Sequence, residues 1–146
     1  MQNFQVEQNI RTLVDEQLKN LGWNLDSRDK NCNVWQEQPR TKEEKEKLKG
    51  KRPDYVLYSS KDQYRKEPLI IIETKKPGEN LEEALKQGDW YAEQLNAPMV
   101  FATDGVYYRT IHTKYQKPLY LNGEEIDELI RELEAIKFLE KNEVDT

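Results

Sequence analysis

Leu69-Ile-Ile-Ile-Glu-Thr-Lys75 is the stretch of this sequence that decides the fold. Its four consecutive aliphatic residues predict a strand that is buried on both faces of a sheet. Glu73 and Lys75 follow two residues apart, so their side chains lie on the same face. Buried charge is costly unless it is paired or bound to a metal, which makes these two residues candidates for a functional site. The alternative is that they are only the solvated end of the strand.

The residues before this strand predict a neighbour in the sheet. Pro53 begins a run of alternating residues that is typical of a strand, with Asp54 at its start. A polar turn over residues 59–66 then leads into residues 69–75. We therefore expect two antiparallel neighbouring strands, with Asp54 close to the end of the buried strand.

A helix and two further strands follow. Asn80 is placed to cap a helix whose apolar stripe ends before Pro98. Residues 99–103 then predict a strand parallel to the buried one, because a strand–helix–strand succession implies a right-handed crossover. Asp104-Gly105 is expected to turn a hairpin into a strand over residues 106–111.

Both ends of the chain show helical spacing of apolar residues. The spacing predicts a first helix over residues 4–20 and a last amphipathic helix that carries Ile126 to Ile136. The stretch 26–50 is mostly polar; it is expected to be loop or frayed helix, apart from a short strand at 33–36. The pattern as a whole predicts an α/β fold with a mixed central β-sheet flanked by helices.

Composition limits the class of protein. A chain of 146 residues suits one compact domain, which we expect over residues 1–139, with a tail or the start of a linker over residues 140–146. No stretch resembles a membrane span or a signal peptide, so a soluble cytoplasmic protein with no membrane partner is expected. Cys32 and His112 are the single cysteine and histidine, too few for a zinc site, and are expected to be structural or surface residues.

The net charge of −5 speaks against a nucleic-acid partner, but the charge is unevenly distributed. Residues 40–52 hold seven basic and three acidic residues, a local excess of 7 − 3 = +4. This excess lies directly before Asp54, so it could place cations along a phosphate backbone. The alternative is a solvated loop or helix face. The candidate DNA-binding residues are Lys45, Lys47, Lys49, Lys51 and Arg52.

The candidate site has the residue types that phosphodiester hydrolysis needs. Asp54 and Glu73 can bind a divalent metal, with the main-chain carbonyl of Thr74 as a third ligand. Lys75 can orient the attacking water and stabilise negative charge in the transition state. Magnesium is the expected ion, and manganese can substitute for it.

The next helix offers two further candidates. Gln87 and Tyr91 lie one turn apart and can reach the same cleft. Their alternative role is ordinary packing beside the apolar stripe.

These residues resemble a known nuclease superfamily. Arg52-Pro-Asp54, followed by Glu73-Thr-Lys75, resembles the Pro-Asp…Asp/Glu-x-Lys nucleases, and Gln87-Gly-Asp-Trp-Tyr91 resembles the Gln-x-x-x-Tyr motif of one of its subsets. The likeness is to the N-terminal nuclease domain of type I restriction R subunits, and it covers most of the chain. It implies a restriction-endonuclease-like fold and a magnesium-dependent endodeoxyribonuclease.

The resemblance also implies roles for residues and partners. Asp54 and Glu73 would be metal ligands, Lys75 catalytic, and Glu7 a further acidic residue near the metal; Gln87 and Tyr91 would support the site and contact DNA. The partners would be double-stranded DNA and either the specificity and methyltransferase subunits or a translocase domain. The chain has no phosphate-binding loop, so ATP is expected only where a translocase domain is present elsewhere.

The sequence is also compatible with two other functions. One is a catalytically inactive, nuclease-like module that docks DNA or partner subunits. The other is a scaffold with no nucleic-acid role, which predicts no DNA binding even with the basic segment intact.

Overall fold

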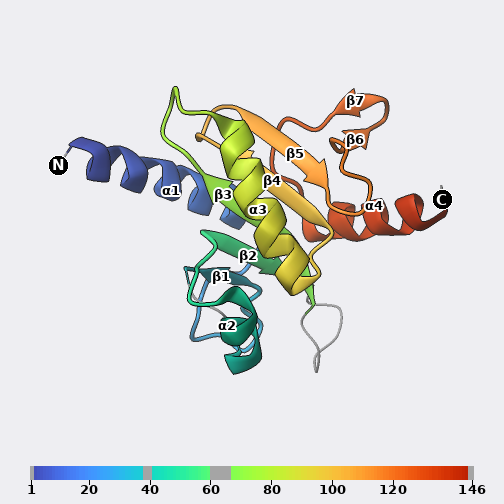
Figure 1. The fold of residues 1–146 in the computed structure, drawn as a ribbon, viewed down its shortest axis with the longest axis horizontal. Coiled ribbons are helices and arrows are strands. Elements are labelled where there is room, and N and C mark those ends of the chain that lie inside the picture. Colours follow the sequence, from blue (N-terminus) through green and yellow to red (C-terminus); the bar gives the residue numbers. More distant parts are fainter. Residues whose placement is uncertain (1, 38–40, 60–66, 145–146) are drawn as a thin grey trace.

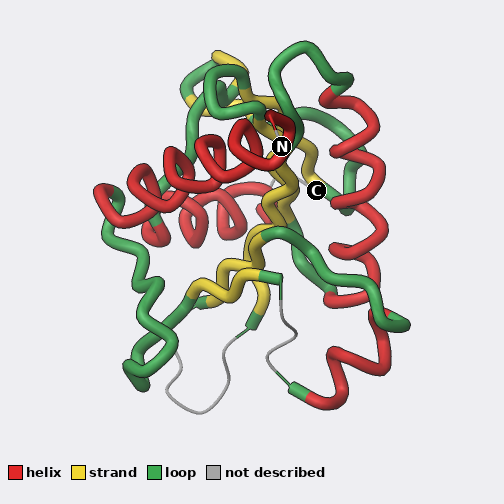
Figure 2. The backbone as a smooth tube through the Cα atoms, turned by 90° about the vertical axis from the view of Figure 1, so that its left-hand side faces the viewer, coloured by secondary structure: helices red, strands yellow, loops and turns green. Residues whose placement is uncertain are grey.

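The computed structural model describes residues 2–37, 41–59 and 67–144, with side chains from residue 9 to residue 138 in those ranges. The chain forms a mixed sheet with helices on both faces (Figure 1). Seen from the side, the sheet lies between two layers of helices (Figure 2). The predicted α/β fold class is therefore confirmed. In the described part of the chain no helix is both long and apolar enough to span a membrane.

The central sheet has the strand order β1-β2-β3-β4-β5. β3 and β4 pair in parallel, whereas the other neighbouring strands pair antiparallel. Both predicted pairings of the buried strand are thus confirmed. The strands are β1 (Val34–Gln36), β2 (Tyr55–Tyr58), β3 (Pro68–Thr74), β4 (Met99–Thr103) and β5 (Tyr108–His112).

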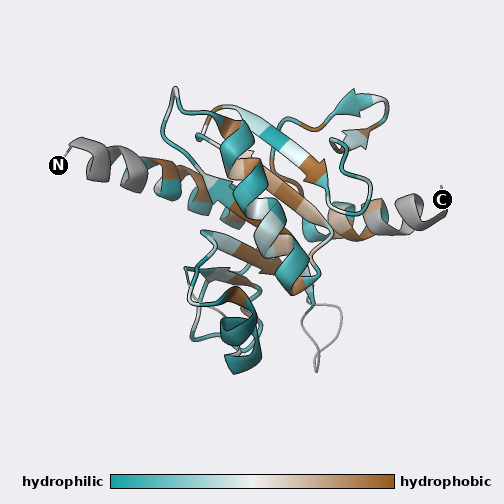
Figure 3. Ribbon diagram, in the orientation of Figure 1, coloured by the Kyte–Doolittle hydropathy of each residue, from teal (hydrophilic) through white to brown (hydrophobic). Residues whose placement is uncertain are grey.

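The alternation of side chains along the strands divides the core into two halves. Tyr55 and Leu57 of β2 face the half that also contains α1 (Gln2–Asn20) and α4 (Glu132–Val144), whereas Val56 and Tyr58 face the half under α3 (Leu81–Leu95). In the view of Figure 3 the hydrophobic residues gather mainly in the central strands, and the side of α3 turned towards the viewer is largely hydrophilic. The sheet is therefore covered on both faces, as expected for β3 with its four consecutive aliphatic residues.

The predicted end of the first helix and the predicted cap of the helix after β3 are confirmed. α1 ends at Asn20, and the N–H of Trp23 turns back to the carbonyl of Leu18 at 3.0 Å, with Gly22 at a φ of 93° between them. The side chain of Asn80 caps α3 by accepting a hydrogen bond from the N–H of Glu82 at 2.9 Å.

The prediction for the last helix was wrong at its start. α4 begins at Glu132, and the apolar residues before it are buried in a non-helical segment. Their main-chain groups have other partners, because the Ile126 N–H donates to the carbonyl of Leu119 and the Ile130 carbonyl accepts from the indole of Trp23. Apolar spacing alone did not separate a helix from a non-helical segment that buries its apolar residues.

Two further segments differ in detail from the expectation. The polar stretch contains a real helix, α2 (Lys42–Leu48), capped by Thr41. A small hairpin of β6 (Tyr120–Leu121) and β7 (Glu124–Glu125) was not predicted.

Two further expectations concern the end of the domain and the polar turn before β3. α4 continues to Val144, past the expected end of the domain at residue 139, and the domain limits stay a prediction. Of the turn expected at 59–66, residues 60–66 lie outside the described residues. Arg40 lies outside them as well.

Candidate active site

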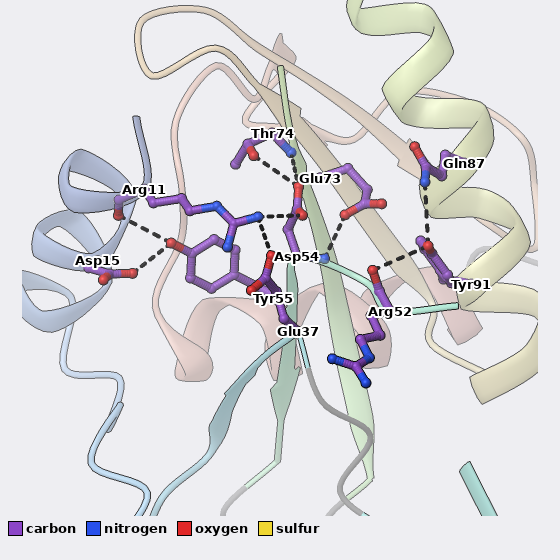
Figure 4. A network of polar contacts seen from close by, with 10 residues as sticks. All are labelled: Arg11, Asp15, Glu37, Arg52, Asp54, Tyr55, Glu73, Thr74, Gln87 and Tyr91. Carbon is purple, nitrogen blue, oxygen red and sulfur yellow. Dashed lines mark hydrogen bonds and ion pairs between the residues drawn. The ribbon is translucent and has the colours of Figure 1, made fainter. Parts of the chain in front are cut away.

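The register of the sheet brings Asp54 and Glu73 together. Tyr55 lies opposite Ile72 in the antiparallel pair β2–β3, so the residue before Tyr55 meets the residue after Ile72. The main-chain N–H of Asp54 donates a hydrogen bond of 2.8 Å to Oε2 of Glu73 (Figure 4). The two predicted carboxylates thus share one end of the sheet, although they are nineteen positions apart in the chain.

Glu73 is a buried carboxyl group in an unfavourable setting. Its exposed fraction is 3%. Burial, followed by the negative charge of Asp54, raises the pKa of Glu73 to about 9, while the N–H of Asp54 and the positive charge of Lys75 act in the opposite direction. Without a further cation, Glu73 therefore holds a proton at neutral pH.

Both carboxylate oxygens of Asp54 accept hydrogen bonds. Oδ2 accepts hydrogen bonds from the N–H and the hydroxyl of Thr74, at 2.8 and 2.9 Å. Oδ1 accepts from the guanidinium of Arg11 at 3.1 Å, and the same Nη2 atom lies 2.6 Å from Glu37 Oε1 (Figure 4). Neither Arg11 nor Glu37 was predicted as a site residue.

The structure places Thr74 and Lys75 next to these carboxylates. Thr74 contacts Asp54 through its donors, whereas the predicted role of its carbonyl as a metal ligand stays a prediction. The positive charge of Lys75 acts on Glu73, as expected from two residues on one face of a strand. The Lys75 N–H is fixed to the carbonyl of Thr103 at the end of β4.

α3 brings Tyr91 and Gln87 to the same end of the sheet. The Tyr91 hydroxyl lies 3.3 Å from the carbonyl of Arg52 and 3.4 Å from the Gln87 amide nitrogen. Burial and, more weakly, the charges of Glu73 and Asp54 raise the pKa of Tyr91, so its hydroxyl is within electrostatic reach of both carboxylates. The predicted Gln87–Tyr91 pair therefore borders the carboxylate pair.

Gly88 makes this approach of α3 possible. A Cβ atom at this position would lie 2.4 Å from Val100 Cγ1 and 3.5 Å from Glu73 Cγ. A larger residue would push α3 away from the sheet at the level of Glu73. Gly88 was not predicted as a site residue.

α1 is fastened to the sheet beside the carboxylates by a second set of polar contacts. The buried Tyr55 hydroxyl lies 2.6 Å from Asp15 Oδ1 and 3.2 Å from the carbonyl of Arg11, and Gln36 donates to the same Asp15 oxygen. Burial raises the pKa of Tyr55 far above its ordinary value, so this hydroxyl stays protonated. Glu7 precedes Arg11 by one helical turn, but its side chain lies outside the described residues.

The predicted DNA-binding residues precede Asp54 in the chain, but α2, which carries two of them, is hydrogen-bonded through Glu44 to Tyr58, at the end of β2 away from Asp54. Lys45 and Lys47 belong to the exposed face of α2, where Lys47 is 3.6 Å from Glu43. The Lys51 ammonium lies over the ring of Trp90 in α3, 4.8 Å from its centre. Lys49, exposed, ends α2, and the Arg52 carbonyl reaches Tyr91. The segment thus leads directly to Asp54.

The carboxylate pair fits magnesium better than a metal that needs a full set of protein ligands. Among the described residues no group of three His, Cys, Asp or Glu side chains could hold a metal ion. Magnesium keeps several waters and binds through one or two carboxylates, which is what Asp54 and Glu73 offer. Cys32 and His112 are both buried, as expected of structural residues.

Comparison with known proteins gives the family. The family described as the type I restriction enzyme R protein N terminus (HSDR_N) matches residues 35–129, more than half of the chain. The chain belongs to this family. The matched segment contains the predicted site residues Asp54, Glu73, Lys75, Gln87 and Tyr91, whereas Arg11 lies outside it. None of the curated proteins matches the chain.

A solved structure has the same fold as this chain. It is a fragment of a protein assigned as an HsdR subunit of a type I restriction enzyme from Vibrio vulnificus YJ016. The two chains are 20% identical, with a TM-score of 0.60 over 91% of this chain. The match spans 25% of the solved chain, so this chain is much shorter than that neighbour.

Proposed function

We propose that this chain is a magnesium-dependent endonuclease domain that cleaves DNA phosphodiester bonds. The observation that carries the proposal is the pairing of Asp54 with the buried Glu73 at one end of the sheet. Two carboxylates that lie close together with little exposure to water repel each other when both are ionised. A divalent cation beside them stabilises the ionised forms. The positive charge of Lys75 acts on Glu73 in the same direction and favours its ionised form.

Each residue has a role in this proposal. Asp54 and Glu73 hold the metal, which, when bound, would polarise the phosphate and lower the pKa of a water. Thr74 orients Asp54 through its two donors, and its carbonyl is a candidate third ligand. Lys75, beside Glu73, orients the attacking water and stabilises the negative charge that develops on the phosphate.

The surroundings supply substrate contacts. Tyr91 and Gln87 fix the Arg52 carbonyl just before Asp54 and border the position of the phosphate. The lysines of residues 45–51 contact neighbouring phosphates of double-stranded DNA. Glu7, one turn before Arg11 on α1, is a candidate further acidic residue near the metal.

The likeness to R proteins supports a setting for this activity. We infer a cytoplasmic restriction system in which the domain works with the specificity and methyltransferase subunits or with a translocase domain. ATP would enter only through such a translocase. The acidic charge of the chain favours this arrangement, because partners would supply part of the affinity for DNA.

One observation favours a second candidate function. Arg11 and Thr74 already satisfy both oxygens of Asp54, as they would in a module that has lost its metal and only docks DNA or partner subunits. The inactive module and the nuclease make opposite predictions for metal binding.

A cleavage assay tests the proposal. Supercoiled plasmid is incubated with the chain and magnesium, with and without the specificity and methyltransferase subunits of the same system, and nicked and linear products are measured. Cleavage that requires magnesium and is lost in Asp54→Asn supports the nuclease. Absence of cleavage in every combination, from a folded protein, supports the docking module.

A further inference from the structure

Arg11 occupies the position next to Asp54 where a cation is needed. Its Nη2 atom lies 3.1 Å from Asp54 Oδ1 and 2.6 Å from Glu37 Oε1. The exposed fractions of the three side chains are 27% for Arg11, 20% for Asp54 and 51% for Glu37. One nitrogen atom is therefore shared between a half-buried carboxylate of the candidate site and a more exposed carboxylate outside it.

The two oxygens of Asp54 are not equivalent. Oδ2 is committed to the N–H and the hydroxyl of Thr74, which fix the direction of the carboxylate. Oδ1 accepts from Arg11, and the guanidinium is a mobile group on a long side chain. Oδ1 is therefore the atom of Asp54 that can exchange one cation for another.

Glu37 is the second carboxylate partner of the Arg11 guanidinium. It follows β1 with a φ of 54°, a left-handed conformation that is unfavourable for a residue other than glycine. Its N–H is held by the carbonyls of Pro53 and Asp54, at 3.1 and 3.2 Å. These contacts tie the Glu37 main chain to the segment that carries Asp54, and its carboxylate forms the shorter of the two ion pairs of Arg11.

The main chain at Arg11 does not depend on the ion pair with Asp54. The Tyr55 hydroxyl lies 3.2 Å from the Arg11 carbonyl and 2.6 Å from Asp15, which in turn accepts a hydrogen bond from Gln36. The guanidinium can therefore leave Asp54 by a rotation of its side chain, without movement of α1.

We propose that Arg11 is the counter-cation of the metal-free site, which a divalent ion displaces from Asp54 Oδ1 onto Glu37. The proposal rests on the proposed function, because it needs a metal at Asp54. Arg11 is here a positioning residue: it keeps Asp54 neutralised and oriented without metal, and it competes with the metal. Glu37 lowers that competition, so the two residues act on metal affinity in opposite directions.

The test is a calorimetric titration of the full chain with Mn²⁺, without DNA. Arg11→Gln is expected to bind Mn²⁺ at least about threefold more tightly than the wild type and to melt at a lower temperature without metal. Glu37→Gln, which changes an exposed side chain, is expected to bind Mn²⁺ more weakly. The double variant should behave like Arg11→Gln, because Glu37 acts only through Arg11.

Controls separate this proposal from the proposed function. Arg28→Gln removes an equally charged but exposed side chain and should bind Mn²⁺ like the wild type. If the wild type binds Mn²⁺ through Asp54 but Arg11→Gln binds it equally or more weakly, the proposal about Arg11 is overturned and the metal site stands. If Arg11→Gln does not fold, tighter or unchanged binding by Glu37→Gln still overturns it. Absence of Mn²⁺ binding in the wild type and in Arg11→Gln overturns both.

Discussion

The N–H of Asp54 donates a hydrogen bond of 2.8 Å to the side chain of Glu73, so a main-chain donor of one predicted metal ligand orients the carboxyl group of the other. The same Asp54 presents its own carboxylate to Thr74, the residue after Glu73. The ends of β2 and β3 therefore fix each other's acidic side chains before any ion is bound. Such preorganisation is what a metal site requires of its protein ligands.

Stability without metal should fall as the pH rises. The pKa of Glu73 is about 9 in the folded chain and 4.5 as its ordinary value, so the folded state keeps a proton that the unfolded state loses between these values. This contribution is fully present below pH 4.5 and is lost towards pH 9, with a slope of at most about 1.4 kcal/mol per pH unit. Urea unfolding between pH 5 and pH 9, in the presence of a chelator, measures it.

Glu73→Gln is the matched variant for this pH dependence. Its amide oxygen can still accept the hydrogen bond from Asp54, and it carries no charge to bury. The variant should lose most of the slope and be more stable than the wild type at about pH 8. Parallel pH profiles of the two proteins would exclude Glu73 as the source.

Gly88→Ala should destabilise the chain, although alanine is the better helix former. The added Cβ would lie 2.4 Å from Val100 Cγ1, which forces α3 away from β4. A loss of about 1–3 kcal/mol in the free energy of unfolding is expected. Helix propensity alone predicts a gain of about 1 kcal/mol. The sign of the change in the free energy of unfolding, measured with urea, therefore shows whether the clash or the helix propensity dominates. The pair of Gly88→Ala and Val100→Ala should show favourable coupling in a double-mutant cycle.

Lys75→Ala should remove cleavage and leave the fold intact. A lysine at the end of a strand contributes to the charge of the transition state rather than to the core, and its loss should lower the cleavage rate by roughly 10²–10³-fold. Circular dichroism checks the fold, and Lys76→Ala serves as the control for the loss of one positive charge. Cleavage by folded Lys75→Ala at the wild-type rate would remove Lys75 from the mechanism.

Replacement of Lys45, Lys47, Lys49 and Lys51 by Gln should weaken DNA binding without changing sequence preference. The log–log dependence on salt should flatten by about 0.9 for each phosphate that the variant no longer neutralises. Binding titrations in Ca²⁺ at several salt concentrations measure the slope. An unchanged slope would assign these lysines to a solvated face, and DNA would then approach from another side.

The sequence was sufficient for the parts of the site that lie on regular elements. The antiparallel pairing of β2 with β3 and the one-turn spacing of Gln87 and Tyr91 follow from local periodicity, which the sequence displays directly. The parallel partner of β3 followed from the handedness of crossovers. These features place Asp54, Glu73 and Tyr91 at one end of the sheet.

The rest depends on interactions between distant segments. Arg11 meets Asp54 across 43 residues, and Glu37 joins them through a left-handed residue at the end of a short strand. A charged residue on a surface helix gives no sign in the sequence of which carboxylate it will meet. The late start of α4 also depends on a distant contact. The indole of Trp23 donates a hydrogen bond to the carbonyl of Ile130, 107 positions further along the chain. The Asn122-Gly123 turn between β6 and β7, by contrast, is a local signal that indicates a hairpin.

The central claim is that Asp54 and Glu73 bind one divalent ion together, and proton release on metal binding tests it most directly. Mn²⁺ is titrated into the chain at pH 7 by calorimetry in two buffers of different ionisation enthalpy. Because Glu73 holds a proton at this pH, the wild type should release about one proton per bound ion, Glu73→Gln should release none, and Asp54→Asn should bind much more weakly. Metal binding that is absent from the wild type, or unchanged in both variants, would contradict the account.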